Sequence, residues 1–403
     1  MVSRRGMIAG GAGAAVLAAL GYRAWDRGVF SFGEGPAFAP WTEWQGRAGE
    51  GIVRPLHAAI LAANPHDTQP WLFAPHGDSI TVYADRARNL GTFDPFRREM
   101  HLGLGCAIAN LQLAAYMMGF FSHSEPSKGQ LDLSPSDAPV AVSRVILRRK
   151  NAPETDAFSV GTMTVQELAQ AIPRRHTNRG PYLARRVPSE FLDGWKRWET
   201  RSPTRIVFMD DIAARKELTN IIVEATAAII ADPEMSADSA RWFRTGAREI
   251  AAHRDGVITD TAGLSPIMRV AAKLMPDQDA ATADRYWLSM TRDVQTATAP
   301  VFGMILVRDR LDMATALEAG STWQSLHLAA TARGLAAQPM NQPVEMVDRN
   351  AMLGRKDHFG PALAKLADMP GWEATFVFRL GYAEREALPS PRRPLSDVMI
   401  RRA

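Results

Sequence analysis

Residues 99–120, EMHLGLGCAIANLQLAAYMMGF, form a long apolar segment whose pattern is that of a helix. Gly103 and Gly105 lie in this segment, and a glycine lets another backbone approach closely because it has no Cβ atom. Cys106, in the same run, is expected to be a buried structural thiol. We therefore expect this helix to lie at the centre of the fold.

Strands and further helices are predicted on both sides of this segment. A partial capping-box pattern, Thr164-Val-Gln-Glu, marks the start of a helix and of a second unit. Strands and long helices that do not strictly alternate indicate an α+β fold. The weakly periodic segment Arg254–Ala281 is too long for a simple connection, so it is expected to be a lid or a disordered insert. The predicted strands are 79–84, 140–149, 205–209, 301–307 and 374–382, and the other predicted helices are 52–63, 213–231, 283–298 and 321–334.

The composition excludes several classes of function. The 403 residues are 46% hydrophobic and 22% charged, which is ordinary for a globular protein. The formal charge is +4, and Lys supplies only 7 of the 47 basic residues, which are scattered among acids and form no stripe for nucleic acid. One cysteine excludes an intramolecular disulfide, a cysteine-held iron–sulfur cluster and a thiolate zinc site. None of the nine His residues has an HExxH spacing, which disfavours a metal-dependent hydrolase.

The N-terminus has the form of an export signal. Arg4 and Arg5 precede an apolar run of small residues from Met7 to Leu20, which is too short for an ordinary membrane-spanning helix. Paired arginines before a weakly apolar run resemble a twin-arginine signal. We expect residues 1–27 to be this signal or a retained anchor, which implies a periplasmic protein or one held at the outer face of the cytoplasmic membrane. A core helix with two chance arginines is the alternative.

Four polar strings could carry chemistry, although none decides the function alone. Arg174–Arg179 places several cationic or donor side chains near a helix end, which suits a phosphate monoester, but basic hexapeptides are commonly solvated faces. Asn64–Phe73 joins a helix end to a strand beside Trp71, and such a turn is often only a cap followed by a core aromatic. The other two strings are the polar loop after Gly334 and the basic run Ser390–Pro394.

Together these strings resemble the nitroreductase family of FMN-binding flavoproteins, and within it the long, two-lobed, Acg-like branch. The resemblance runs from about Ile52 to Asp397 and rests on the order of its motifs. It implies a nitroreductase-like α+β fold, in which a central, mainly antiparallel sheet is flanked by helices and two lobes in one chain mimic a nitroreductase dimer. The motifs are NPHDTQPWLF, DRARNLGTFDPFRREMHLGLGCAIANLQLAA, RRHTNRGPY, GSTWQSLHLAATARGL and FVFRLGYAEREALPSPRRPLSDV.

The resemblance also implies roles for individual residues. Arg175, Thr177 and Arg179 match the segment that holds the ribityl phosphate of FMN, with His176 beside it. Two further sets complete the expected cofactor site. Pro339, Met340 and Asn341 match the loop along the flavin ring, Gln69 and its neighbours match a segment that contacts the isoalloxazine, and Arg392 and Arg393 match basic residues that approach the phosphate.

The sequence departs from the family pattern at one position. Asp67 stands where an Asn is expected, and an ionised carboxylate only accepts hydrogen bonds. Negative charge near the ring is expected to make flavin reduction harder, which puts fast turnover in doubt.

The implied organisation is a linker at 28–45, a first lobe at 46–160 and a second lobe at 161–403 with a possible lid at 254–281. The protein is expected to be an enzyme that moves two electrons through FMN, from a donor such as NAD(P)H, to a nitro, quinone or similar small-molecule acceptor. No protein nucleophile is needed.

The alternative is an exported protein that binds or sequesters FMN with little turnover. The expected partners are the small-molecule acceptor and the twin-arginine translocase, without nucleic acid, for a pseudo-dimeric monomer or a homodimer.

Overall fold

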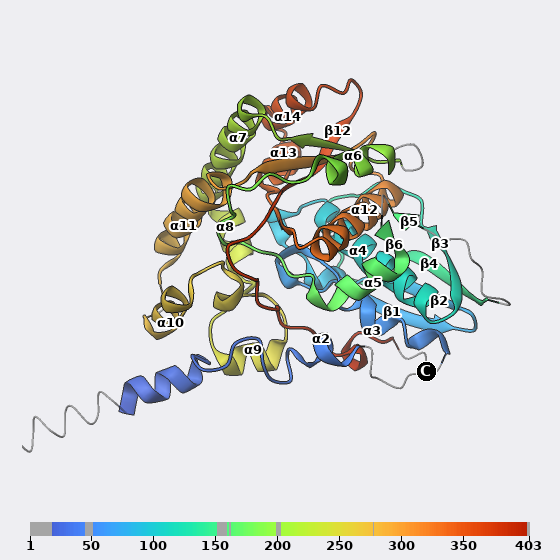
Figure 1. The fold of residues 1–403 in the computed structure, drawn as a ribbon, viewed down its shortest axis with the longest axis horizontal. Coiled ribbons are helices and arrows are strands. Elements are labelled where there is room, and N and C mark those ends of the chain that lie inside the picture. Colours follow the sequence, from blue (N-terminus) through green and yellow to red (C-terminus); the bar gives the residue numbers. More distant parts are fainter. Residues whose placement is uncertain are drawn as a thin grey trace, which may run out of the picture.

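Two four-stranded antiparallel sheets with helices around them make up the computed structural model (Figure 1). The structure describes residues 18–44, 51–150, 159–160, 163–198, 203–276 and 278–400. Each lobe contributes one sheet, so the expected α+β fold with antiparallel sheets, flanking helices and two lobes is confirmed. The expected boundary at 160/161 falls beside residues outside this description.

The first sheet has the strand order β1-β2-β4-β3. Residues Gly77 and Asp78 connect β1 to β2, and Gly77 has a φ of +59°, which this tight turn requires. Side chains alternate between buried and exposed along β4, because only one face of the sheet is covered. The strands are β1 (Trp71–His76), β2 (Ser79–Ala84), β3 (Phe120–Pro126) and β4 (Val140–Arg149).

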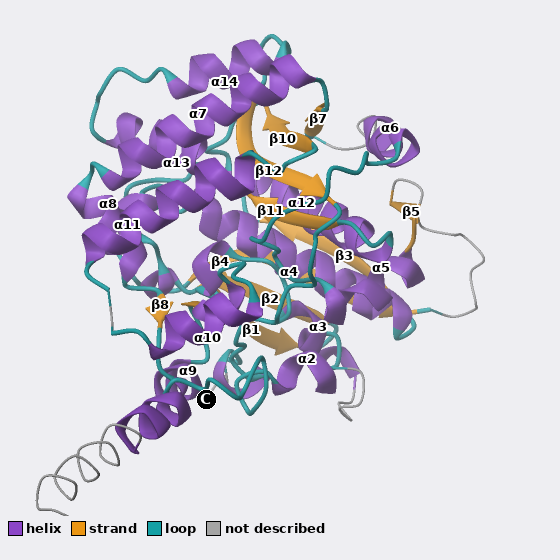
Figure 2. Ribbon diagram, turned by 60° about the vertical axis from the view of Figure 1, so that its left-hand side comes forward, coloured by secondary structure: helices purple, strands orange, loops and turns teal. Residues whose placement is uncertain are grey.

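The second sheet has the strand order β11-β12-β10-β7 and is covered on both faces. Every residue of β10 is buried, which explains its unbroken run of apolar residues. One face is covered by α7 (Ile212–Ile230), α13 (Gln342–Met352) and α14 (Phe359–Ala367), and the other face by α12 (Met313–Ala332) (Figure 2). The strands are β7 (Arg205–Met209), β10 (Val301–Val307), β11 (Ala336–Pro339) and β12 (Glu373–Gly381).

Two long helices, α4 (Arg98–Met117) and α12 (Met313–Ala332), cross at the centre of the molecule. A Cβ atom on Gly105 would lie 1.9 Å from the Leu317 carbonyl oxygen, and one on Gly320 would lie 2.0 Å from the Leu102 carbonyl oxygen. The two contacts are reciprocal, as in a symmetric pair of helices. The predicted central helix is thus confirmed, and its partner is the equivalent helix of the second lobe.

The C-terminal segment returns to the sheet of the first lobe. Phe73 in β1 donates its N–H to the Val398 carbonyl at 2.8 Å and accepts from the Ile400 N–H at 2.8 Å. This parallel pairing adds a short strand beside β1. The chain therefore ties its end to the lobe with which it began, and the preceding residues Ser390–Pro394 run between the lobes.

Most predicted elements are present, with three notable differences. Residues 52–63 form only a 3-10 turn and the short helix α3 (Leu56–Ala59). Residues 283–298 divide into α11 (Ala280–Ser289) and a π-helix (Met290–Thr296). Residues 28–44, expected to be a linker, contain α2 (Ala39–Glu43) and pack against the lobes through buried Phe38, Trp41 and Trp44.

The other helices lie mainly in the second lobe. The expected capping box is confirmed, because the Thr164 hydroxyl accepts from the Glu167 N–H and the Glu167 carboxylate accepts from the Thr164 N–H. The segment 254–281 has regular structure in its described residues. The helices are α5 (Val165–Ala171), α6 (Ser189–Trp198), α7 (Ile212–Ile230), α8 (Pro233–Ala240), α9 (Ala247–His253), α10 (Pro266–Leu274), α13 (Gln342–Met352) and α14 (Phe359–Ala367). Two pairs of very short strands are β5 (Ser159–Val160) with β6 (Met163–Thr164) and β8 (Phe243–Arg244) with β9 (Val257–Ile258).

Candidate functional site

The turn that precedes β1 holds an unusual backbone conformation. His66, Asp67 and Gln69 have φ values of 47°, 55° and 50°, a left-handed region that side chains other than glycine rarely adopt. The Asn64 carboxamide oxygen stabilises this turn by accepting from the Gln69 N–H at 2.7 Å. Strained backbone of this kind is held by its surroundings and clusters at functional sites.

A buried ion pair joins this turn to the C-terminal segment. The Arg392 guanidinium donates to the Asp67 carboxylate, and both side chains are at least 90% buried. Arg392 also donates to the Ser390 hydroxyl at 2.6 Å and to the Pro391 carbonyl at 2.8 Å. Burial raises the pKa of Asp67 to about 6, although the charge of Arg392 opposes the rise.

Arg175 brings a second buried guanidinium to the same place. It follows the 3-10 turn Ile172–Arg174 and donates to the Leu61 carbonyl of the first lobe at 3.1 Å. Its Nη1 atom lies 3.4 Å from Nδ1 of His327. Burial, followed by the charge of Arg392, lowers the pKa of Arg175, so the two guanidiniums repel each other at short range.

Trp41 lies at the centre of this arrangement. Its ring lies 4.7 Å from the Arg392 guanidinium, 5.9 Å from that of Arg175 and 4.5 Å from the His176 ring in an edge contact. Its indole N–H donates to the Ser390 carbonyl at 2.7 Å. The sequence analysis missed Trp41 because it placed residues 28–45 in a linker; the aromatic pattern PAFAPWTEW was the available signal. We call Asp67, Trp41, Arg175, His176 and Arg392 the arginine cluster.

Thr177 and Arg179 adjoin the arginine cluster and face the insert 254–281. Arg179 donates to the Thr261 carbonyl at 3.1 Å. Gly263 has a φ of +80°, and a Cβ atom there would lie 2.4 Å from the Arg179 carbonyl carbon. A small pocket of about 30 Å³ lies between these segments, lined by Thr177, Arg179, Asp260, Thr261, Gly263 and Arg385 among others. The insert therefore packs directly on the segment that was predicted to hold a phosphate.

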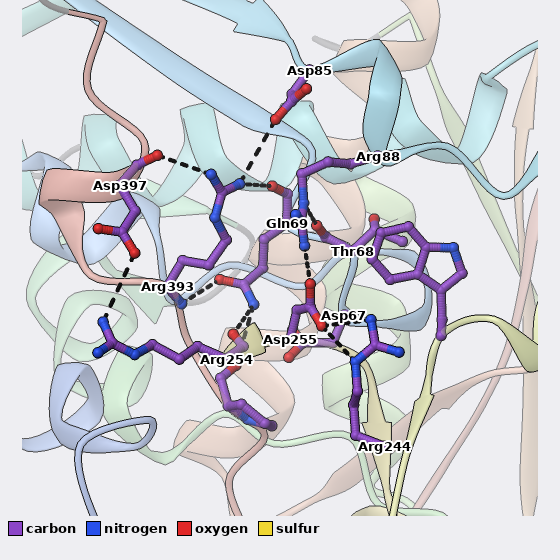
Figure 3. Close-up of polar contacts among 12 residues, drawn as sticks. Asp67, Thr68, Gln69, Asp85, Arg88, Arg244, Arg254, Asp255, Arg393 and Asp397 are labelled. Atoms are coloured by element: carbon purple, nitrogen blue, oxygen red, sulfur yellow. Dashed lines mark hydrogen bonds and ion pairs between the residues drawn. The ribbon is translucent and has the colours of Figure 1, made fainter. Parts of the chain in front are cut away.

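Gln69 and Arg393 lie beside the arginine cluster but point into a different network (Figure 3). The Gln69 carboxamide accepts from the Arg393 N–H at 2.7 Å and donates to the Arg254 carbonyl at 2.8 Å. The Arg393 side chain donates to the Asp397 carbonyl at 2.9 Å and lies 3.8 Å from the Asp85 carboxylate. These contacts give Arg393 partners at the protein surface, whereas the side chain of the neighbouring Arg392 is buried and pairs with Asp67.

The loop predicted to lie along a flavin ring occupies a separate buried region. Pro339 ends β11, and Met340 and Asn341 lead into α13. The side chains of these three residues are buried or half-buried. Asn341 donates to the Glu99 carboxylate and accepts from the Val377 N–H at 3.1 Å. Burial raises the pKa values of Glu99 and Glu345, which lie side by side. The described contacts of this loop are thus with the start of α4 and with β12, not with the arginine cluster.

The polar atoms of the arginine cluster lack partners to a degree that is rare in a folded interior. Nε of Arg175, Nε of Arg392, Nδ1 of His176 and one carboxylate oxygen of Asp67 are buried without a hydrogen bond. Two buried guanidiniums face a single carboxylate, and burial with Arg175 nearby lowers the pKa of His176 to about 3, so its ring is neutral. Such an excess of positive donors fits a phosphate dianion, which would accept from the unpaired N–H groups.

The described residues also bear on metal binding and on membrane crossing. Among them, no group of three or more His, Cys, Asp or Glu side chains could hold a metal ion. No helix within the described part of the chain is long and apolar enough to cross a membrane.

Comparison with known proteins identifies relatives along most of the chain. No protein-family model matches it. Two proteins from strains of Mycobacterium tuberculosis, each named "Putative NAD(P)H nitroreductase", are 26% identical to it over 358 residues, which cover 85% of this chain and 89% of each relative. The chain is therefore similar to nitroreductase-like proteins, and the resemblance to the nitroreductase family is confirmed, while the Acg-like branch stays a prediction.

Similar solved structures include a nitroreductase with bound FMN from Desulfitobacterium hafniense, with a TM-score of 0.36 and 13% identity over 59% of this chain and 98% of that one. Another is an FMN-dependent nitroreductase from Mycobacterium smegmatis in complex with NADPH, with a TM-score of 0.37 and 18% identity over 59% of this chain and 98% of that one.

Proposed function

We propose that the protein is an FMN-dependent oxidoreductase of the nitroreductase type, in the two-lobed, Acg-like branch. The observation that carries this proposal is the arginine cluster, in which two buried guanidiniums with unpaired Nε atoms face a single carboxylate and whose residues come from both lobes. The full-length relatives named as NAD(P)H nitroreductases support it.

Residues from three parts of the chain would hold the cofactor. Arg175 and Arg392 would donate to the FMN phosphate, since their buried Nε atoms have no partner. Thr177 and Arg179 would complete this set from the next turn. Trp41 would keep water away from the phosphate because its ring covers both guanidiniums.

Bound FMN would supply the chemistry, a two-electron transfer from NAD(P)H to a nitro, quinone or similar acceptor. The chain's own contribution is to bind, orient and exclude water. Asp67 keeps Arg392 oriented through their ion pair. The insert 254–281 would act as a lid, because Thr261 and Gly263 lie on Arg179.

A second candidate function is binding or storage of FMN with little turnover. The close packing of Gly263 on the Arg179 backbone favours it, since a closed insert would exclude substrate as well as water. Asp67 in the cluster favours it too, because negative charge near a flavin makes reduction harder.

The absorbance spectrum of the purified full chain, followed by anaerobic addition of NADPH, tests both candidates. Flavin bands that bleach on addition of NADPH would support the oxidoreductase. Flavin bands that do not bleach would support storage. A colourless protein that cannot be reconstituted with FMN would overturn both.

We further propose that the protein is exported through the twin-arginine translocase and acts in the periplasm or at the outer face of the cytoplasmic membrane. Arg4, Arg5 and residues 7–17 of the apolar run that carries this proposal lie outside the described residues. We also infer that one chain is the working unit, because α4 and α12 already pair as two subunits of a dimer would. A mass of one chain in solution would support this inference, and a stable dimer would contradict it.

A further inference from the structure

Helix α10, in the insert, turns its charged face towards the protein and its apolar face towards solvent. Its charged residues turn inward: Lys273 is buried and bonds the Asp260 carboxylate at 2.9 Å, and Arg269 lies 3.6 Å from the same carboxylate. Its outward face carries Ile267, 83% exposed, and Met268, with Ala271 and Ala272 beyond them. A surface helix normally shows the opposite arrangement.

The last part of the predicted signal or anchor, residues 18–27, lies against this helix. Residues 18–26 are helical, and Arg23 within them donates to the Leu274 carbonyl at 2.8 Å. Lys273 in turn donates to the Gly28 carbonyl at 3.0 Å. Figures 1 and 2 both show this first helix and α10 at the same end of the molecule, beside α9. The two segments therefore form one surface.

That surface is apolar and aromatic, with the ion pair of Arg248 and Asp26 at its margin. Phe30 is 82% exposed, and Tyr22 and Trp25 are also exposed. Arg248 lies over the Trp25 ring at 5.1 Å and is itself largely exposed. We call Tyr22, Trp25, Phe30, Ile267, Met268 and Met275 the α10 surface. Monomeric soluble proteins seldom expose so many large apolar side chains together unless something binds them.

We propose that the α10 surface binds the interface of a phospholipid bilayer. In the sequence, the apolar run Met7–Leu20 leads directly into it, and that run suits a membrane-directed segment. Tyr and Trp with neighbouring Arg side chains are the residues enriched at the boundary between headgroups and acyl chains. An amphipathic helix that lies in this boundary buries its apolar face by a few ångströms, and α10 presents such a face outward. This docking is independent of the flavin chemistry proposed above.

A single fluorescent probe can test this proposal on the full chain. Cys106 is buried and burial raises its pKa to about 12, so a thiol reagent would label an added surface cysteine selectively. Ile267→Cys, labelled with an environment-sensitive dye, is mixed with vesicles of phosphatidylglycerol and phosphatidylethanolamine. Ile212→Cys, at the exposed start of α7, is the matched control.

We expect the emission at position 267 to shift to the blue and to rise roughly two-fold with vesicles, because this face enters the interface. The emission at position 212 is expected to stay unchanged. Unchanged dye emission at position 267, in a protein that still sediments with vesicles, would mean that only residues outside the described structure bind the membrane. That outcome would overturn the proposal. A shift at 267 on concentrating the protein without vesicles would show that another copy covers the surface, which would also overturn it.

A charge substitution gives an independent check. Ile267→Glu together with Met268→Glu is expected to lower vesicle binding on the order of 10-fold, since two apolar side chains no longer leave water. Ile212→Glu is expected to change nothing. Equal binding by the double variant and the unchanged protein, with intact folding by circular dichroism, would contradict the proposal.

Discussion

Asp67 and Arg392 are separated by 325 positions in the chain and form a buried ion pair. Asp67 lies in the strained turn before β1 of the first lobe, and Arg392 lies in the segment that returns from the second lobe. Breaking one partner of such a pair leaves the other as an unpaired buried charge, which is costly. The pair thus joins the lobes at the place where the proposed phosphate would bind. The Asp67 carboxylate therefore competes with the phosphate for the Arg392 guanidinium.

Asp67→Asn is therefore expected to strengthen FMN binding by roughly 10-fold at pH 7.5, since Arg392 no longer shares its donors with a carboxylate. Burial raises the pKa of Asp67 to about 6, so the native side chain is ionised at pH 7.5 and becomes neutral as the pH falls below that value. The difference between the two proteins should shrink by pH 5. Fluorescence titration of FMN at both pH values measures it, and equal affinities at pH 7.5 would contradict the competition. The reduction potential of the flavin should also rise in this variant.

Arg175→Ala is expected to weaken FMN binding by on the order of 10- to 100-fold, because a charged hydrogen-bond donor to the phosphate is lost. Arg174→Ala is the matched control, since Arg174 is the exposed neighbour. The flavin absorbance retained after gel filtration reports the effect. Retention that is the same in both variants would remove Arg175 from the phosphate site.

Trp41→Ala is expected to lower the free energy of unfolding by about 3 kcal/mol, because a large buried ring is removed. Trp41→Phe keeps most of the packing and loses only the N–H donor to the Ser390 carbonyl, which should cost about 1 kcal/mol. Urea denaturation of both variants measures these values. If both variants have the same free energy of unfolding as the native protein, residues 28–44 act as a linker and do not stabilise the lobes.

Gly105→Ala and Gly320→Ala are each expected to destabilise the protein by about 2 kcal/mol or more, because the added methyl group meets a carbonyl oxygen of the facing helix. Gly246→Ala is the control, since a Cβ atom there meets nothing within 4 Å and its φ is −103°. The melting temperatures of the three variants distinguish a tight crossing from a loose one. A melting temperature unchanged by either substitution at the crossing would argue against the close approach of α4 and α12.

Replacement of Arg4 and Arg5 together by Lys is expected to abolish export, since the proposed signal depends on the arginine pair. Immunodetection in periplasmic and cytoplasmic fractions measures the outcome. The full chain with both arginines is the reference, and a variant that still reaches the periplasm would contradict the proposed route.

Local pattern alone predicted much of this protein. The apolar periodicity of residues 99–120 gave the central helix, the pattern Thr164–Glu167 gave a capped helix, and alternating residues gave β2 and β4. These features depend on neighbours a few positions away, whose preferences are written in the sequence itself. The order of the motifs likewise indicated nitroreductase-like relatives.

The tertiary structure decided which of the predicted site residues lie close together. It brought Trp41 from a supposed linker into the arginine cluster, and it placed Asn341 against Glu99 in a different region. It also paired the chain's end with β1 and turned the charged side of α10 inward. Most of these contacts join positions hundreds of residues apart, and burial, which shifts the pKa of Asp67, exists only after the lobes have packed.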